Sequence, residues 1–108
     1  LVTVRFGYDK SSLDSQAKKD IATNVAWMKA NPTVNVQIEG HCDARGTIEY
    51  NVALGERRAN AVKAYMASLG IPGNRLSVIS YGKEKPLDSA DTEAAWAKNR
   101  RANFVPAQ

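Results

Sequence analysis

The sequence contains only one cysteine and one histidine, which are adjacent as His41 and Cys42. A single cysteine excludes a disulfide within the chain, and one residue of each type is too few for a structural zinc site of Cys and His ligands. Because successive residues of an extended chain point to opposite faces, His41, Cys42 and Asp43 are not expected to converge on one catalytic or metal centre. We therefore expect no metal and no cofactor, and we interpret Cys42 as a buried, unreactive thiol and His41 as a structural or rim residue.

Patterns typical of hydrolases are also missing. The sequence has no Gly-x-Ser-x-Gly segment, and Glu39 and Asp43 lie four residues apart across the end of a predicted strand, which is no glycosidase pattern. An enzyme needs a nucleophile with a base, paired carboxylates or a metal. The sequence therefore favours a protein that is not an enzyme and has no catalytic residues.

Long apolar runs and blocks of like charge are absent as well, so no membrane span is predicted. The chain has 15 Lys and Arg against 11 Asp and Glu, a net charge of +4, which favours acidic partners in general. These basic residues are scattered and form no stripe with aromatic residues, so nucleic-acid binding is not expected. The residues from Leu1 onward have a strand pattern and not that of a signal peptide. A targeting segment is therefore expected only upstream of Leu1.

What the sequence does have is the composition of one globular domain, with 44% apolar and 24% charged residues. Alternation of apolar and polar residues predicts strands over 2–8, 34–41 and 75–82, and a last strand at 100–105. The residues of the first strand that are expected to face inward are Val2, Val4, Phe6 and Tyr8.

Two long helices are predicted between these strands. The first spans about 14–30, with Asp14 or Ser15 as its N-cap, and its apolar stripe consists of Ala17, Ile21, Val25 and Met28. The second spans about 47–69, with Thr47 as its cap and Gly70 just beyond its end. A shorter helix, capped by Asp91, is predicted before the last strand.

The resulting order, β-α-β-α-β-(α)-β, predicts an α/β (α+β) fold with a single domain over residues 1–108. Two consecutive β-α units are typical of parallel neighbouring strands, and a last strand that follows a short connection is expected to run antiparallel. We therefore predict a mixed four-stranded sheet with helices packed on it.

Arg58 occupies an unexpected position in the second long helix. At about 100° per residue it lies near the middle of the apolar stripe, and Asn51, seven residues earlier, lies on the same line. This stripe consists of Val62, Tyr65, Met66 and Leu69. Because a buried guanidinium cannot lose its charge, it needs acceptors or hydration, and we expect an anionic group nearby.

The loop GHCDARGT at 40–47 supplies a candidate partner, Asp43. It joins a strand to the helix that carries Arg58, a place where α/β sheets commonly bind ligands, and Gly46 eases its turn. Two interpretations remain open. Asp43 and Arg58 form a structural salt bridge, or they hold a zwitterion, with the carboxylate binding an ammonium group and the guanidinium a carboxylate. Asn51 could hydrogen-bond either half of such a ligand.

The segment VQIEGHCDARGTIEYNVALGERRANAVKAY closely resembles the OmpA-like peptidoglycan-binding domains of Gram-negative envelopes. The resemblance covers essentially the whole chain, because VRFGYDKSSL, SYGKEKP and AKNRRANFV are also similar to segments of that family. The chain departs from the family at Cys42, where many of these domains have threonine. The resemblance implies non-catalytic binding of peptidoglycan through the meso-diaminopimelate residue of the stem peptide, whose free end is an α-amino acid zwitterion.

The resemblance also implies roles for individual residues. It identifies Asp43 as the ammonium-binding aspartate and Arg58 as the carboxylate-binding arginine, with Asn51 in the same site. The other positions that it implies, as pocket walls or further contacts, are Tyr8, Asp9, Leu54, Arg45 and Thr47.

For the whole protein, the resemblance implies a lipid anchor and linker upstream of Leu1, a place on the periplasmic side of the outer membrane, and contacts with proteins of the Tol system. The soluble domain is expected to be a monomer that meets the membrane only through this anchor. An alternative is an envelope protein-interaction module whose main ligands are proteins. The presence of Asp43, Asn51 and Arg58 together argues against a vestigial pocket, although both roles could use different surfaces.

Overall fold

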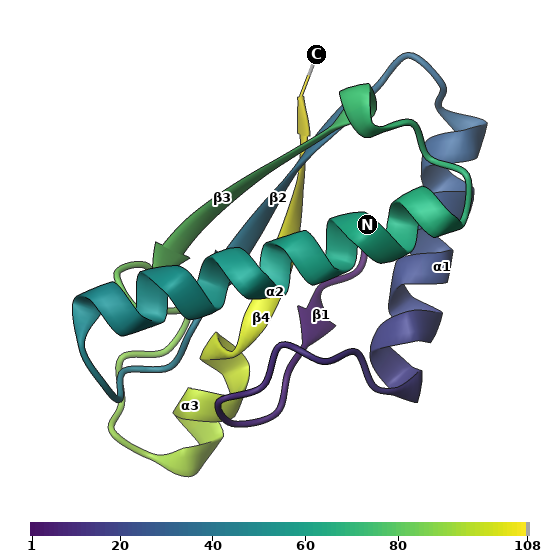
Figure 1. Ribbon diagram of the computed structural model, residues 1–108. Coiled ribbons are helices and arrows are strands. Elements are labelled where there is room, and N and C mark those ends of the chain that lie inside the picture. The colour runs from purple at the N-terminus through teal and green to yellow at the C-terminus, as the bar shows by residue number, and fades with distance from the viewer. Residues whose placement is uncertain (108) are drawn as a thin grey trace.

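The computed structural model describes residues 1–107, which form one sheet and three α-helices (Figure 1). In chain order the elements are β1 (Val4–Arg5), α1 (Ser15–Ala30), β2 (Asn35–His41), α2 (Ile48–Ser68), a 3-10 turn (Gly73–Arg75), β3 (Leu76–Gly82), α3 (Glu93–Asn99) and β4 (Arg101–Ala107). In Figure 1, α2 crosses one face of the sheet, and α1 stands beside the C-terminal half of α2. Within residues 1–107, no helix is both long and apolar enough to cross a membrane.

The mixed four-stranded sheet is confirmed, and its strand order is β1-β4-β2-β3. The strands β2 and β3 are parallel neighbours, as predicted, whereas β4 runs antiparallel to both β1 and β2. The expectation that each β-α unit joins neighbouring strands is wrong for the first unit, because β4 lies between β1 and β2. Seven residue pairs join β4 to β2, and only two join β1 to β4, so the long strand satisfies many more backbone groups at this central position.

The first strand is shorter than predicted. It spans Val4–Arg5 instead of 2–8, and of the four residues expected inward only Val4 and Phe6 are buried, whereas Val2 and Tyr8 are exposed. The chain turns away from the sheet after Phe6, because the carbonyls of Gly7 and Lys10 accept hydrogen bonds from the Arg58 side chain. Asp9, with φ of 56°, lies in the left-handed region within this turn.

The helix boundaries agree with the sequence prediction at two of three caps. Asp14 caps α1 through a 2.7 Å hydrogen bond from the Ala17 N–H, and Thr47 caps α2 through a 3.1 Å bond from the Tyr50 N–H. The sequence predicts Asp91 as the third cap, but Thr92 caps α3, since its hydroxyl accepts a hydrogen bond from the Ala95 N–H. The last strand extends to Ala107, two residues beyond the predicted range.

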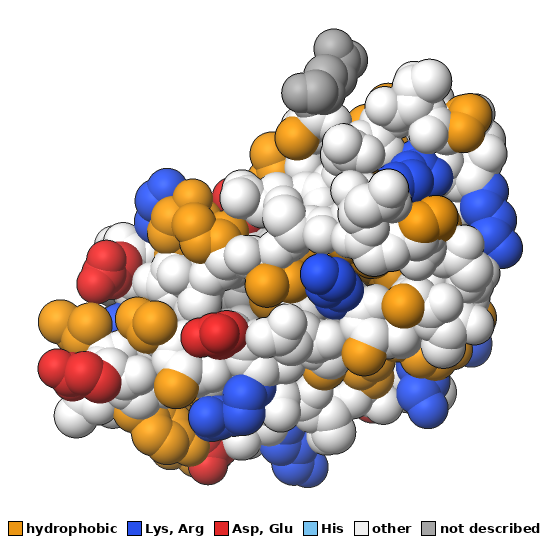
Figure 2. All heavy atoms as spheres, turned by 45° about the horizontal axis from the view of Figure 1, so that its top comes forward, with side chains coloured by type: hydrophobic (Ala, Val, Ile, Leu, Met, Phe, Trp, Pro, Cys, Tyr) orange, Lys and Arg blue, Asp and Glu red, His pale blue; other side chains and the backbone are white. Residues whose placement is uncertain are grey.

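The core lies between the helices and the sheet. Every residue of the predicted α1 stripe is buried, and so are Val62 and Met66 of α2, whereas Tyr65 and Leu69 are partly buried against the same core. The outer surface has no single dominant charge on the face shown in Figure 2, where Lys and Arg side chains lie apart with acidic and uncharged groups between them.

Two glycines let α2 lie directly on the sheet. A Cβ atom at Gly40 of β2 would lie 1.8 Å from the carbonyl oxygen of Gly55 of α2, and a Cβ atom at Gly55 would lie 2.3 Å from the Ser80 hydroxyl oxygen of β3. The helix and the strand therefore meet backbone to backbone. This contact holds the N-terminal half of α2 against the ends of β2 and β3, and with it the residues around Arg58.

We predict that Gly40→Ala lowers the free energy of unfolding by at least about 2 kcal/mol, because the methyl group would displace α2 from β2. Gly73→Ala is the matched control, since a Cβ atom there meets nothing within 4 Å, and it should change stability by less than about 0.5 kcal/mol. Urea unfolding followed by circular dichroism measures both. Equal effects of the two substitutions would contradict a tight helix-to-strand contact.

Candidate functional site

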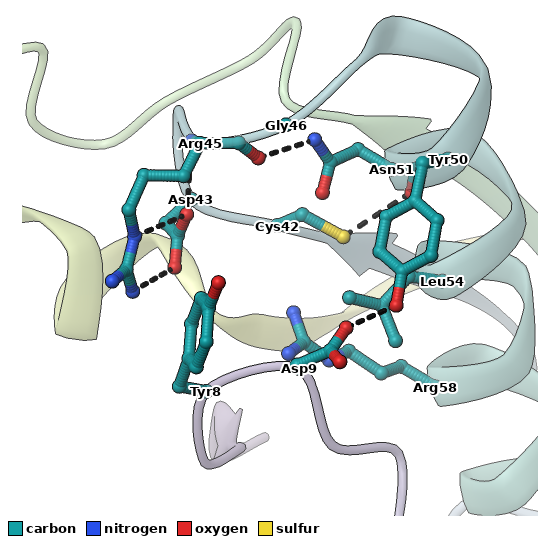
Figure 3. Close-up of a pocket in the computed structure, with 10 residues that line it drawn as sticks. All are labelled: Tyr8, Asp9, Cys42, Asp43, Arg45, Gly46, Tyr50, Asn51, Leu54 and Arg58. Atoms are coloured by element: carbon teal, nitrogen blue, oxygen red, sulfur yellow. Dashed lines mark hydrogen bonds and ion pairs between the residues drawn. The ribbon is translucent and has the colours of Figure 1, made fainter.

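A small pocket of about 60 Å³ lies beyond the end of β2, where the chain leads into α2 (Figure 3). Three segments form it: the turn after β1, the loop between β2 and α2, and the first turns of α2. The lining residues are Tyr8, Asp9, Cys42, Asp43, Arg45, Gly46, Tyr50, Asn51, Leu54 and Arg58.

This pocket contains every residue predicted for the site except Thr47. Thr47 instead caps α2, and its carbonyl accepts a hydrogen bond from the Asn51 amide. The site prediction did not include Cys42, Gly46 or Tyr50. The residue Tyr50 lies next to Asn51 in the motif, but no signal along the sequence joins it to its partner Asp9, which is 41 residues away.

Arg58 lies in the wall of the pocket and is only 1% exposed. It donates hydrogen bonds to three backbone carbonyls: from Nε to Lys10 at 2.8 Å, from Nη1 to His41 at 2.9 Å and from Nη2 to Gly7 at 3.1 Å. Three of its five N–H donors therefore have partners, and one N–H on each Nη atom is left. Burial lowers the pKa of Arg58, but a guanidinium remains charged at neutral pH.

The structural salt bridge between Asp43 and Arg58, one of the two open interpretations, is not present among the described residues. We expected an anionic group beside Arg58, but the bonded partners of its side chain are backbone carbonyl oxygens. These oxygens accept hydrogen bonds from the guanidinium without cancelling its positive charge.

The ion-pair partners of Asp43 are two other arginines. The Arg45 side chain donates from Nε to Oδ1 at 3.2 Å and from Nη2 to Oδ2 at 2.8 Å, and its backbone N–H donates to Oδ1 at 3.0 Å. Arg100 Nη1 lies 3.7 Å from Oδ2. Burial alone raises the pKa of Asp43, but the hydrogen bonds from Arg45 and the charge of Arg100 outweigh it, so this pKa lies below its ordinary value. Asp43 is therefore a carboxylate at neutral pH.

Asn51 organises the loop and has one amide atom left for a ligand. Its Nδ2 donates to the carbonyls of Arg45 at 2.7 Å and Thr47 at 2.9 Å, so both amide hydrogens are used within the protein. From the sequence, Asn51 could bind either half of a zwitterion. In the structure only its Oδ1 atom remains for a ligand, and this atom can only accept a hydrogen bond. It suits an ammonium group and not a carboxylate.

Cys42 and His41 are both buried, as the interpretation of each as a structural residue requires. The Cys42 thiol is buried and donates to the Asn51 carbonyl at 3.2 Å, and burial raises its pKa, which favours the protonated thiol. His41 is also buried, within 3.1 Å of the Glu39 carboxylate. Within residues 1–107 no group of three or more His, Cys, Asp or Glu side chains is placed to hold a metal.

Two tyrosines form the rim of the pocket. Tyr8 and Tyr50 are 60% and 47% exposed, and the Tyr50 hydroxyl donates a hydrogen bond to the Asp9 carboxylate across the pocket mouth. This bond joins α2 to the turn after β1. Opposite charges inside and aromatic rings outside suit a small ligand that carries both an ammonium group and a carboxylate.

Comparison with known proteins gives a match to the OmpA family over residues 5–100. The chain is 46% identical over 100 residues to the peptidoglycan-associated lipoproteins of Rhizobium meliloti (strain 1021) and Haemophilus influenzae, and each match covers 93% of this chain. These matches cover 57% and 65% of the relatives, so the chain spans about three fifths of their length.

Solved structures agree with this match. The crystal structure of the peptidoglycan-associated lipoprotein from Burkholderia pseudomallei has a TM-score of 0.93 and 38% identity, covering 97% of this chain and 89% of that one. The C-terminal domain of Helicobacter pylori MotB has a TM-score of 0.92 at 19% identity, covering 100% of this chain and 85% of that chain, which shows a shared fold alone.

We predict that Asp43→Asn lowers stability at pH 7 and makes stability less sensitive to acid. Because the pKa of Asp43 is lower in the folded protein than in the unfolded chain, its stabilisation is complete above the unfolded value of about 3.9 and is lost as pH falls through the folded value. The difference between wild type and variant in urea unfolding should therefore shrink from pH 7 to about pH 3. A constant difference, or an equal effect of the exposed control Asp91→Asn, would contradict this role.

Proposed function

The chain belongs to the OmpA family, and from this membership and the charges of its pocket we propose that it binds peptidoglycan without cleaving it, through the meso-diaminopimelate residue of the stem peptide. The names of its relatives, peptidoglycan-associated lipoproteins, support the polymer, and the sequence resemblance supports the residue within it.

The observation that carries this proposal is a carboxylate and a guanidinium facing one small pocket without pairing with each other. The free end of meso-diaminopimelate bears an ammonium group and a carboxylate on the same carbon. In our proposal the ammonium group binds Asp43 and the Oδ1 atom of Asn51, and the carboxylate binds the remaining N–H donors of Arg58. The walls are Tyr8, Asp9 and Leu54.

Arg45 and Thr47 contribute to the site differently in this proposal. Arg45 binds Asp43 and lines the pocket, whereas Thr47 fixes the start of α2. We find no candidate in the pocket for the catalytic residues that cleavage would need. The buried thiol donates a hydrogen bond to a backbone carbonyl, and the carboxylates of Asp9 and Asp43 are hydrogen-bonded to Tyr50 and Arg45.

At the level of the cell, we propose a lipoprotein domain on the periplasmic side of the outer membrane that links this membrane to the cell wall. The lipoprotein relatives, of which the chain spans about three fifths, support the upstream anchor and linker. The sequence resemblance also implies contacts with Tol proteins, and we propose that these use surfaces outside the pocket.

We predict that Asp43→Asn and Arg58→Lys each weaken binding of a soluble diaminopimelate-type muropeptide by about thirtyfold or more. Asp43→Asn leaves the ligand ammonium group without a counter-charge, which costs about 2–5 kcal/mol. Arg58→Lys keeps a positive charge but loses the planar guanidinium, whose parallel N–H donors suit a carboxylate and whose other donors bind three backbone carbonyls. These conservative variants are preferred because alanine at Arg58 would also leave the carbonyls of Gly7, Lys10 and His41 without a donor. Isothermal titration measures the affinity, and circular dichroism checks the fold.

The matched control for these variants is Lys19→Met, which removes an exposed charge on α1, a helix that contributes no residue to the pocket. It should bind like wild type. Wild-type affinity in folded Asp43→Asn or Arg58→Lys would rule out the proposed zwitterion site.

We further predict strong preference for diaminopimelate-type over lysine-type muropeptides. A lysine side chain has the ammonium group but lacks the neighbouring carboxylate, so Arg58 would lose its ligand partner. Attraction between a protein of charge +4 and an acidic polymer would instead give similar affinities that fall together with added salt. Titrations of both muropeptides at two salt concentrations distinguish these cases, and equal affinities lost together in high salt would contradict specific recognition.

A further inference from the structure

The Arg45 guanidinium is held between two aromatic rings. Its central carbon lies 4.0 Å from the centre of the Tyr8 ring and 4.2 Å from the centre of the Trp96 ring. Tyr8 lies in the turn after β1, but Trp96 comes from α3 and does not line the pocket. A residue outside the pocket therefore contacts a group that binds the pocket's carboxylate. We call Tyr8, Arg45 and Trp96 the arginine clamp.

The arginine clamp contacts Asp43 from one side. In Figure 3 the Asp43 carboxylate lies between the Arg45 guanidinium and the opposite wall, which Arg58 and Asn51 form. The two side-chain bonds from Arg45 use one lone pair on each carboxylate oxygen. The backbone N–H of Arg45 also donates to Oδ1, and a carboxylate accepts about four hydrogen bonds, so this geometry fixes its plane and leaves acceptor capacity on Oδ2.

We propose that Trp96 is a positioning residue of the binding site: by stacking on Arg45 opposite Tyr8, it holds the guanidinium in the orientation that aims Asp43 at the ligand ammonium group. This inference rests on the proposed function. The Arg45 side chain is 31% exposed and long, and without a ring on either side it would have several rotamers available in water. The rings restrict it to the one that binds Asp43 with two parallel bonds.

The face of the Trp96 ring, and not its N–H, makes this contact. Its Nε1 is buried and has no hydrogen-bond partner among residues 1–107. The indole is therefore present for its packing and its π face, which attracts a cation such as a guanidinium. Phenylalanine keeps such a face, whereas leucine keeps apolar volume without one. These two substitutions separate the clamp from simple packing.

The experiment measures affinity for a soluble diaminopimelate-type disaccharide tetrapeptide by isothermal titration. We expect Trp96→Leu and Trp96→Ala to weaken binding by about three- to tenfold, and Trp96→Phe to restore most of it. Trp27→Leu, at the other tryptophan of the chain, is the matched control and should leave affinity unchanged, because Trp27 packs against the core on α1. Wild-type affinity in Trp96→Leu would overturn the proposal.

Two further measurements distinguish positioning through Arg45 from a general loss of structure. In an Arg45→Met background, Trp96→Leu should have no additional effect, because the group through which Trp96 acts is gone. The carbon-13 shift of the Asp43 carboxyl group should titrate at a higher pH in Trp96→Leu, since Arg45 then stabilises the carboxylate less, while Arg58 and Arg100 are unchanged. Full additivity, or an unshifted titration, would overturn the proposal.

These experiments distinguish a failure of the proposed function from a failure of the arginine clamp. If wild type binds no diaminopimelate-type muropeptide, the proposed function fails, yet the Asp43 titration still tests the arginine clamp. If wild type binds and Trp96→Leu binds equally well, the proposed function stands and the clamp alone fails.

Discussion

A buried guanidinium on α2 joins the segments that form the pocket. Arg58 donates to the carbonyls of Gly7 and Lys10 in the turn after β1 and to His41 at the end of β2. These bonds exist because Gly40 and Gly55 allow α2 to lie on β2 without side chains between them. The cost of burying the charge is offset by three hydrogen bonds that also shape the pocket, so folding and the proposed ligand binding depend on the same side chain.

The fold could be predicted from periodicity because its long elements bury one face each. Strand β2 alternates, and α1 and α2 carry apolar stripes that the core fills. The insertion of β4 between β1 and β2 could not be predicted in this way, since pairing between strands far apart in the sequence leaves no local pattern. The same holds for the length of β1, because the carbonyls that follow it bond to the side chains of Arg100 and Arg58.

Part of the candidate site could be predicted, because a charged residue interrupts the apolar stripe of α2. A charge at the centre of an apolar stripe marked Arg58, and the loop before the helix marked Asp43, and both line the pocket. The carbonyl partners of Arg58 were not predictable, because backbone carbonyls have no sequence signature, and neither was Arg100, which follows Asp43 by more than fifty residues. Trp96 was missed for the same reason, since its contact with Arg45 exists only once α3 is in place.

Asp43 and Arg58, two of the four charged residues that line the pocket, differ in the charge of their partners. Asp43 is bonded to the cation Arg45 and lies near Arg100, so its charge is largely neutralised, whereas the partners of Arg58 are neutral carbonyls. Dipoles satisfy hydrogen-bond donors without cancelling a net charge, so the region around Arg58 keeps a positive potential. In the proposed function, a ligand carboxylate is therefore the anionic partner that Arg58 lacks among the described residues. In the proposed function, Asp43 and Asn51 orient the zwitterion, and Arg58 supplies most of the discrimination against side chains that lack the carboxylate.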